Sequence, residues 1–197
     1  NGYLHWLDRR FHAQSGPYTW ADTRLVRYAD DFVILARYQG ERIADWLEGL
    51  LEKRMGLTIN REKSKVVRLE GGKESLDFLG FTFRYDRDLY ARSGKRYLNV
   101  IPSKKSVKRA REAIRAKTGP KNCFKPAPAV VSDLNRYLTG WSGYFDYGYP
   151  RMAFRAVNHY TGSRMIGHLN RRSQRKYRKP KEESHYQHLN RLGLERL

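Results

Sequence analysis

Residues 23–38 read TRLVRYADDFVILARY and place two adjacent aspartates, Asp30 and Asp31, between two short apolar runs. Short runs rich in Leu, Val, Ile and Tyr or Phe are typical of strands, so the pattern predicts a hairpin with strands over 25–28 and 32–36. Tight hairpin turns favour Asn-Gly or Asp-Gly, which makes Asp-Asp an unusual turn. Two interpretations remain open from these residues: a solvated turn, or a pair of carboxylates that binds a cation.

The chain around this acidic pair is strongly basic. Its 197 residues hold 40 Lys and Arg against 20 Asp and Glu, a net charge of +20 with a pI near 10.2. Residues 1–100 contribute 18 basic and 14 acidic side chains, whereas residues 101–197 contribute 22 and 6. The second half therefore indicates a polyanionic partner, most simply nucleic acid. An anionic membrane surface is the weaker alternative, because no helix with a broad apolar face is evident.

Several classes of protein are excluded or disfavoured. No apolar run approaches the roughly 20 residues of a membrane span. Cys123 is the only cysteine, which excludes an internal disulfide and a thiolate zinc site. The chain begins at Asn1 and shows no signal-peptide pattern, so we expect a mature or excised piece of a protein that is not secreted. The cytoplasm is the expected location, with an organelle as the alternative.

The predicted elements mix helices with strands up to about residue 101 and are helical after it, which indicates an α+β fold followed by an all-α unit. In the first part we expect helices over 3–12 and 41–55, with a loop over 14–22 between them and Gly56 ending the second helix. We then expect strand segments at 57–59 and 66–69 around a polar turn, followed by a turn at Gly71-Gly72. A strand over 76–85 with Gly80 inside it and a return strand over 97–101 complete this part. In the second part we expect helices over 103–117, 130–141 and 152–173, then either a short helix or a tail ordered on binding over 186–197.

Several motifs together resemble one family. Tyr28-Ala29-Asp30-Asp31 resembles the Tyr-Ala-Asp-Asp box of reverse transcriptases. In the group II intron branch of that family, the neighbouring palm motifs are similar to YLHWLDRRF (3–11), GLTINREKSKV (56–66) and FLGFTF (78–83), and the first thumb helix to IPSKKSVKRAREAIR (101–115). LNRYLTGWSGYFDYG (134–148) resembles the Gly-Trp and Tyr-Phe signature of the maturase-specific domain, also called domain X. The resemblance runs in family order to about residue 180.

This resemblance implies the C-terminal part of a group II intron-encoded reverse transcriptase/maturase, a retroelement protein. The implied fold is a partial reverse-transcriptase palm (an antiparallel sheet with helices) over 1–101, an all-α thumb and maturase domain over 102–181, and a tail over 182–197. The implied function is RNA-directed DNA polymerase, a nucleotidyltransferase, that also binds group II intron RNA and assists its splicing and mobility. The alternatives are an RNA-binding splicing cofactor without polymerase activity, and a reverse transcriptase recruited to another role such as defence.

The resemblance also assigns the polymerase residues. Asp30 and Asp31 would hold two Mg²⁺ ions, shared with an aspartate outside this chain, and Lys63 would approach the incoming dNTP or its pyrophosphate. Tyr28, Ala29 and Gly80 would lie near the DNA primer on its RNA template. The alternative for these three residues is a packing role without substrate contact, and the alternative for Lys63 is a solvated surface lysine. Neither Asp8 nor Asp22 matches the surroundings of the third aspartate. We therefore expect the chain alone to be inactive without the N-terminal fingers and palm of the same enzyme.

The basic half supplies the predicted RNA-binding residues. Six cations against the single acid Glu112 over residues 104–115 make a solvated surface the weaker interpretation of the 103–117 helix. Trp141, Tyr144 and Phe145 could stack on unpaired bases, but we favour the core, because Trp141 continues an apolar stripe. His185 and His188 form no metal-site pattern and are predicted to be surface residues. The predicted RNA-binding residues are Lys104, Lys105, Lys108, Arg109, Arg111, Arg115, Arg171, Arg172, Arg175 and Lys176.

Overall fold

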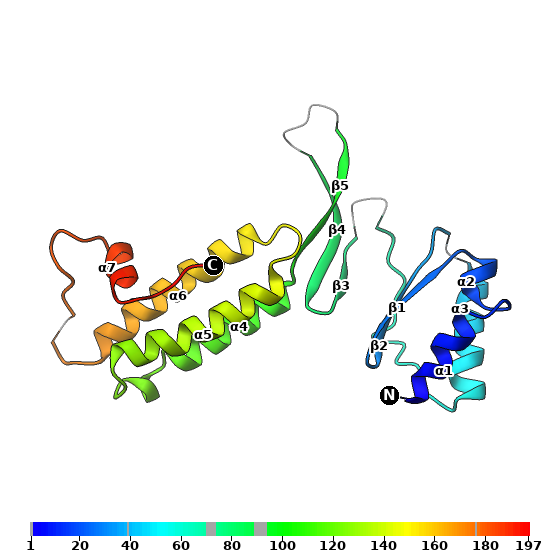
Figure 1. Ribbon diagram of the computed structural model, residues 1–197, viewed down its shortest axis with the longest axis horizontal. Helices are drawn as coiled ribbons and strands as arrows, with labels where there is room; N and C mark the ends of the chain where they lie inside the picture. Colours follow the sequence, from blue (N-terminus) through cyan, green and yellow to red (C-terminus); the bar gives the residue numbers. More distant parts are fainter. Residues whose placement is uncertain (1, 39, 70–73, 89–93, 176) are drawn as a thin grey trace. The chain divides into compact units, whose positions relative to one another are not determined.

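The computed structural model of the chain describes residues 2–38, 40–69, 74–88, 94–175 and 177–197. It forms two compact units, Asn1–Val66 and Val67–Leu197, each with its own apolar core. Helices and two small antiparallel sheets alternate in the first part of the chain, and helices alone follow residue 102. The predicted α+β fold followed by a helical region is therefore confirmed (Figure 1).

The first unit packs helices against one face of a hairpin. Leu7, Leu50, Leu51 and Met55 form its buried core, and alternate side chains of the first strand face this core. The predicted helices and hairpin are present, and a short helix lies within the predicted loop. The elements are α1 Gly2–Phe11, α2 Pro17–Trp20, β1 Arg24–Tyr28, β2 Asp31–Leu35 and α3 Glu41–Glu48, which continues as the π-helix η1 Gly49–Arg54.

The register of the hairpin sets its turn. Tyr28 pairs with Asp31, so the loop consists of Ala29 and Asp30, and Asp31 already belongs to β2. Ala29 has a positive φ of 53°, an uncommon conformation for alanine. Leu25 and Phe32 both reach the apolar core in this register. Asp31 forms the last pair of the ladder, so the turn is Ala29-Asp30 rather than Asp30-Asp31.

The segment after η1 differs from the prediction. Gly56 ends the helix with φ +63° as expected, and the polar turn is present, because the Lys63 and Ser64 N–H groups donate to the Asn60 carbonyl. Residues 57–59 and 66–69, however, form no strand. The Ile59 N–H donates to the Glu52 side chain, and Arg61 binds the same carboxylate at 2.9 and 3.0 Å. These contacts hold the segment against η1 rather than in a sheet.

The second unit begins with an antiparallel sheet of order β3-β4-β5, formed by β3 Leu76–Phe78, β4 Phe81–Arg87 and β5 Arg96–Pro102. The prediction of one strand over 76–85 is wrong. Leu79 and Gly80 both have positive φ, 48° and 82°, the pattern of a tight hairpin turn, and the chain reverses there. The predicted return strand is confirmed as β5, whereas the predicted turn at Gly71-Gly72 lies outside the described residues.

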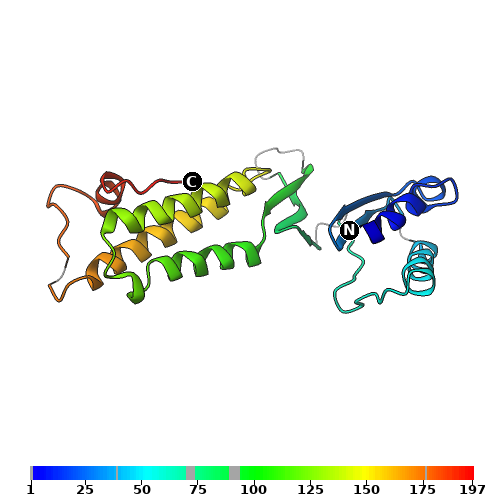
Figure 2. The same ribbon diagram turned by 60° about the horizontal axis from the view of Figure 1, so that its bottom comes forward.

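Four helices complete the second unit, and the three long ones run alongside one another (Figures 1 and 2). Their shared core includes Ala110 and Ile114 of the first, Leu134 and Leu138 of the second, and Met165 of the third. The predicted long helices are confirmed, and the C-terminal segment contains a short helix whose Leu189 is buried. The helices are α4 Lys104–Lys117, α5 Ala127–Phe145, α6 Arg151–Arg171 and α7 His185–Arg191, with a 3-10 turn, η2, at Pro120–Asn122.

The boundary between the units lies at Val66–Val67, which groups the β3-β4-β5 sheet with the helices. The functional boundaries predicted at residues 101 and 181 are of a different kind and stay predictions. Among the described residues, no helix is long and apolar enough to cross a membrane.

Candidate nucleic-acid interface

The tip of the β1-β2 hairpin presents both aspartates to solvent. Asp30 lies in the turn and Asp31 begins β2, opposite Tyr28, which is 66% exposed. Arg27 stabilises the turn, because its Nη1 donates a hydrogen bond to the Ala29 carbonyl at 2.8 Å. Its Nε and Nη2 donate to the Asp8 carboxylate of α1 at 2.9 and 2.6 Å. The turn is thus tied to α1 through one guanidinium.

Asp8 is committed to this structural ion pair. The hydrogen bond from Arg27 holds the pKa of the Asp8 carboxyl below its ordinary value, so Asp8 is ionised and balances the Arg27 charge. Asp30 and Asp31 lie exposed at the hairpin tip, and carboxyl oxygens are the hard ligands that Mg²⁺ prefers. Across the described part of the chain, no group of three His, Cys, Asp or Glu side chains is placed to hold a metal. The two carboxylates fit Mg²⁺ in chemistry and would be partial ligands.

Three further predicted residues lie in this unit. Tyr28 and Ala29 sit at the hairpin tip beside the aspartates. Lys63 is exposed in the turn that follows Asn60, and its backbone N–H donates to the Asn60 side chain at 3.2 Å. No hydrogen bond or ion pair in the described residues joins Lys63 to Asp30 or Asp31. The contacts predicted for Tyr28, Ala29 and Lys63 with substrate stay predictions.

Gly80 approaches protein side chains closely. Its carbonyl accepts hydrogen bonds from the Ser103 N–H and the Ser106 hydroxyl, both at 2.8 Å. A Cβ added at Gly80 would lie 3.0 Å from Ser106 Oγ and 3.3 Å from Phe145 Cζ. Glycine is therefore explained by packing of the β3-β4 turn against α4 and α5. A contact with the primer stays a prediction.

One side of α4 is buried and the other is cationic. Ser106, Ala110 and Ile114 recur every four residues and face the core. Ser103 caps the helix by accepting a hydrogen bond from the Ser106 N–H at 3.1 Å. The solvent side carries five exposed cations that form no ion pair in the described part of the chain: Lys104, Lys105, Lys108, Arg109 and Arg115.

Some of the predicted RNA-binding arginines make structural contacts. The Arg111 guanidinium lies 5.6 Å from the centre of the Tyr160 ring of α6. Arg171 donates to the Thr118 carbonyl at 2.7 Å, and Arg172 to the Cys123 carbonyl at 3.4 Å. These contacts tie α6 to the segment between α4 and α5. Arg175 is exposed, and Lys176 lies outside the described residues.

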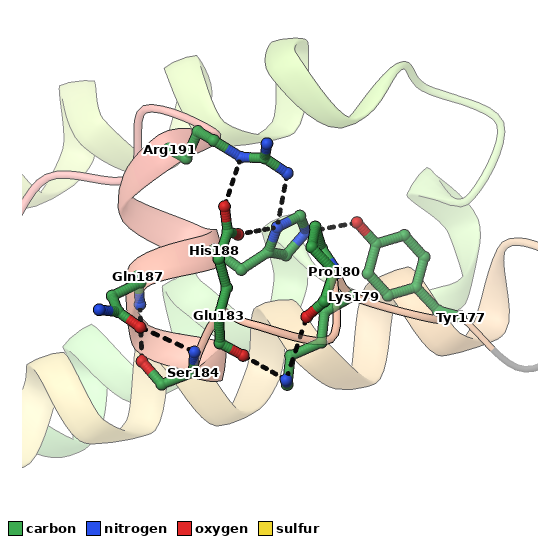
Figure 3. A network of polar contacts seen from close by, with 8 residues as sticks. All are labelled: Tyr177, Lys179, Pro180, Glu183, Ser184, Gln187, His188 and Arg191. Atoms are coloured by element: carbon green, nitrogen blue, oxygen red, sulfur yellow. Dashed lines mark hydrogen bonds and ion pairs between the residues drawn. The ribbon is translucent and has the colours of Figure 1, made fainter.

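A polar network holds the basic segment that joins α6 to α7 (Figure 3). His188 of α7 is only 4% exposed; one ring nitrogen lies 2.5 Å from the Tyr177 hydroxyl and the other 3.2 Å from Glu183. Glu183 also pairs with Arg191 at 3.3 Å. The prediction that His188 is a surface residue is wrong, whereas His185 is exposed. The reason is tertiary: Tyr177 and Glu183 belong to the preceding segment and cover His188.

The aromatic residues of α5 divide between the core and the surface. Trp141 and Phe145 are buried in the helical core, which confirms the favoured interpretation for these two residues. The core prediction is wrong for Tyr144, which is exposed because its hydroxyl donates to the Leu79 carbonyl at 2.8 Å and holds the ring at the β3-β4 turn.

The geometry of the second unit can now be compared with known families. Residues 107–188 match the family model described as the group II intron, maturase-specific domain. This part of the chain is thus similar to a maturase-specific domain. The matched span runs from Val107 in α4 to His188 in α7, so it covers most of the helical core and part of the network around His188. No curated protein matches the chain significantly.

The match confirms the resemblance to the C-terminal region of a group II intron maturase. Such a domain supports a role in group II intron splicing and an interaction with the intron RNA. The polymerase motifs before residue 107 lie outside the matched span.

Proposed function

We propose that this maturase domain binds group II intron RNA through the exposed side of α4 and thereby assists splicing. The observation that supports this most is the coincidence of two features: the family match covers most of the helical core, and α4 of that core presents five cations without an ion pair in the described part of the chain. They extend over residues 104–115, about 17 Å of helix. RNA carries one negative charge per nucleotide, so a cationic row of this length can contact several successive phosphates.

Binding of the protein to the intron RNA can assist splicing through mass action. A large RNA populates its active fold only in part, and a protein that binds this fold in preference to others raises its population. The α4 side chains act through phosphate contacts, which fix the position of the protein without reading sequence. Selectivity for one intron then depends on RNA shape and on contacts with unpaired bases.

We further propose that the chain is the C-terminal part of an RNA-directed DNA polymerase. The Asp30-Asp31 tip supports this second function, because two hard carboxylates stand on a hairpin whose turn Arg27 and Asp8 brace. Magnesium bound there would supply the positive charge that polarises a primer hydroxyl and neutralises nucleotide phosphates. Asp30 and Asp31 would orient and hold these ions together with an aspartate from outside the chain. Lys63 would place its ammonium near the phosphates of the nucleotide.

The RNA-binding proposal is tested with the triple variant Lys104→Gln, Lys108→Gln and Arg115→Gln. We expect its affinity for a transcribed group II intron RNA to fall at least tenfold at about 0.1 M salt. We also expect the slope of log affinity against log salt to fall by about 2 to 3, because each lost phosphate contact removes about 0.7 to 0.9. Filter binding across a salt series measures both quantities.

The matched control removes the same charge elsewhere, by Lys95→Gln, Lys121→Gln and Arg136→Gln, at three exposed cations outside the proposed interface. Equal loss in the control and the α4 variant would show a diffuse electrostatic effect and contradict the assignment to α4.

The polymerase proposal is tested by Asp30→Ala in the intact enzyme. Primer extension on an RNA template should be abolished, because one of the two metal-holding carboxylates of this chain is lost, while the affinity for intron RNA stays unchanged. Extension at the wild-type rate would contradict the metal-binding role. Asp22→Asn is the control, since Asp22 is exposed and its one ion pair among the described residues is with Arg24, at 3.2 Å.

A further inference from the structure

A groove runs between α6, α7 and the segment that follows α7. Its volume is about 430 Å³, within the range of sites that hold small organic groups. Ile166 of α6, Leu189 of α7 and Leu194 supply apolar side chains, and the last two are buried. The two helices lie close together here, since a Cβ added at Gly162 would make an ordinary van der Waals contact with Leu189 Cδ1 at 3.7 Å. The floor of the groove is therefore apolar.

The rim of the groove carries cations and imidazoles. Arg155 and His159 lie four residues apart on one face of α6, and His185 begins α7. Arg196 lines the opposite side, and its guanidinium stacks over the Tyr186 ring. Within the described residues, neither arginine forms an ion pair. A neutral imidazole donates one N–H in either tautomer, so all four groups can donate to a phosphate or a ribose.

Glu195 is the acidic side chain that lines the groove, and it forms hydrogen bonds with α5. Its carboxylate accepts from the Thr139 hydroxyl at 3.5 Å, and its backbone N–H donates to the Asn135 side chain at 3.1 Å. The two arginines outnumber it, so the rim is cationic overall.

Two asparagines hold the wall that carries Arg196. Asn135 of α5 donates to the Gly193 carbonyl at 2.7 Å. Asn158 of α6 donates to the Leu197 carbonyl and accepts from the Leu197 N–H, both at 3.1 Å. The segment after α7 is thus fastened on both sides of Arg196. A wall fixed in advance reduces the entropy lost when a ligand binds.

We propose that this α6-α7 groove binds one or two unpaired nucleotides of RNA. The apolar floor and the stacked Tyr186-Arg196 pair fit the flat face of a base, and the cationic rim fits the adjoining phosphates. A duplex hides its base faces, so the groove selects single-stranded segments. The inference rests on the proposed RNA-binding function and adds a second contact, because none of the groove residues belongs to the cationic side of α4.

The test uses the full chain and two fluorescent probes, a 12-nucleotide oligouridylate and an RNA duplex of the same length. Tyr186→Leu removes the stacking face and keeps the charge. We expect it to lower affinity for the single strand about fivefold or more and to leave duplex affinity unchanged. Tyr186→Trp should restore single-strand affinity, which a merely structural role of Tyr186 would not predict.

A charge variant provides an independent measurement. Arg155→Gln with Arg196→Gln should weaken single-strand binding more than Lys121→Gln with Arg136→Gln, which removes two exposed cations elsewhere. The groove proposal would be overturned if both double variants bound the single strand with equal affinity. It would also be overturned if Tyr186→Leu lost the same affinity for the single strand as for the duplex.

The outcome separates the groove from the function on which it rests. If the groove variants bind normally while the α4 triple variant loses intron RNA, only the groove proposal fails. If the wild-type chain binds neither probe nor intron RNA, both proposals fail.

Discussion

Arg27 shows how one side chain can determine whether neighbouring carboxylates are available. Its guanidinium donates to the Ala29 carbonyl at the turn and to both oxygens of Asp8, and no hydrogen bond among the described residues joins it to the Asp30 or Asp31 side chain. The sequence identified the acidic pair but not its support. Asp8 lies 19 residues before Arg27, and no local pattern joins the two positions.

The Asp8-Arg27 pair makes a prediction about pH. Asp8→Asn should lower the free energy of unfolding of the first unit by about 0.5–1 kcal/mol, a figure reduced for solvent screening. Because folding lowers the pKa of Asp8, the ion pair stabilises fully above the ordinary value of 3.8 and is lost as pH falls through the lowered pKa. Urea unfolding should show the same difference from wild type at pH 7 and 5.5, and a smaller one below pH 3.8.

Asp22→Asn is the matched control, because its pair with Arg24 is mostly exposed and should contribute little. A difference for Asp8→Asn that grows as pH falls would contradict the assigned direction.

At the scale of single residues, His188 marks the limit of prediction from sequence. The Ser184 and Gln187 pattern of a capping box is visible in the sequence and locates the start of α7. The burial of His188 depends instead on Tyr177 and Glu183, which reach it only after the segment between α6 and α7 folds back. Because α7 has only seven residues, such tertiary contacts, rather than helical periodicity, determine which of its side chains are buried.

At the scale of elements, long helices were predictable and short strands were less so. The four-residue spacing of Ala110 and Ile114 located α4, because a long amphipathic pattern allows few alternatives. LDFLGFTFRY is a nearly continuous apolar run, and such a run does not reveal a reversal inside it. Residues 57–59 had strand-like composition, yet the Glu52 contacts with Ile59 and Arg61 decided their conformation.

The turn between α5 and α6 gives a prediction at this scale. Gly148 has φ +80°, and a Cβ added there would lie 2.3 Å from the Val100 carbonyl oxygen. The neighbouring Tyr149 N–H donates to that carbonyl at 2.8 Å, so the turn cannot withdraw without losing this bond to β5. Gly148→Ala should destabilise the second unit by about 2–4 kcal/mol. Thermal unfolding followed by circular dichroism measures the loss.

Gly143→Ala is the control within α5, where no atom outside the helix lies within 4 Å of the added Cβ. It should be neutral or stabilising by up to about 1 kcal/mol, since alanine favours a helix over glycine. Equal destabilisation by both variants would contradict the contact with β5 as the cause.

At the scale of the whole molecule, the two candidate functions belong to different compact units. The aspartate tip and Lys63 lie in Asn1–Val66, whereas α4, the α6-α7 groove and the family match lie in Val67–Leu197. The charge asymmetry of the sequence, with net charges of +4 over residues 1–100 and +16 over residues 101–197, predicted a nucleic-acid partner for the second half but not the unit boundary at Val66–Val67. It did not locate the α6-α7 groove, whose rim is brought together from residues 155 to 196 only by folding.

The most direct test of the central claim is the splicing rate of a transcribed group II intron in the presence of the chain. We predict that wild type and Asp30→Ala accelerate splicing equally, because the aspartate tip has no part in RNA binding by the helical unit. The variant Lys104→Gln, Lys108→Gln and Arg115→Gln should lose most of this acceleration, while the control at Lys95, Lys121 and Arg136 retains it. Undiminished acceleration by the α4 variant would contradict the claim that the maturase domain assists splicing through this face.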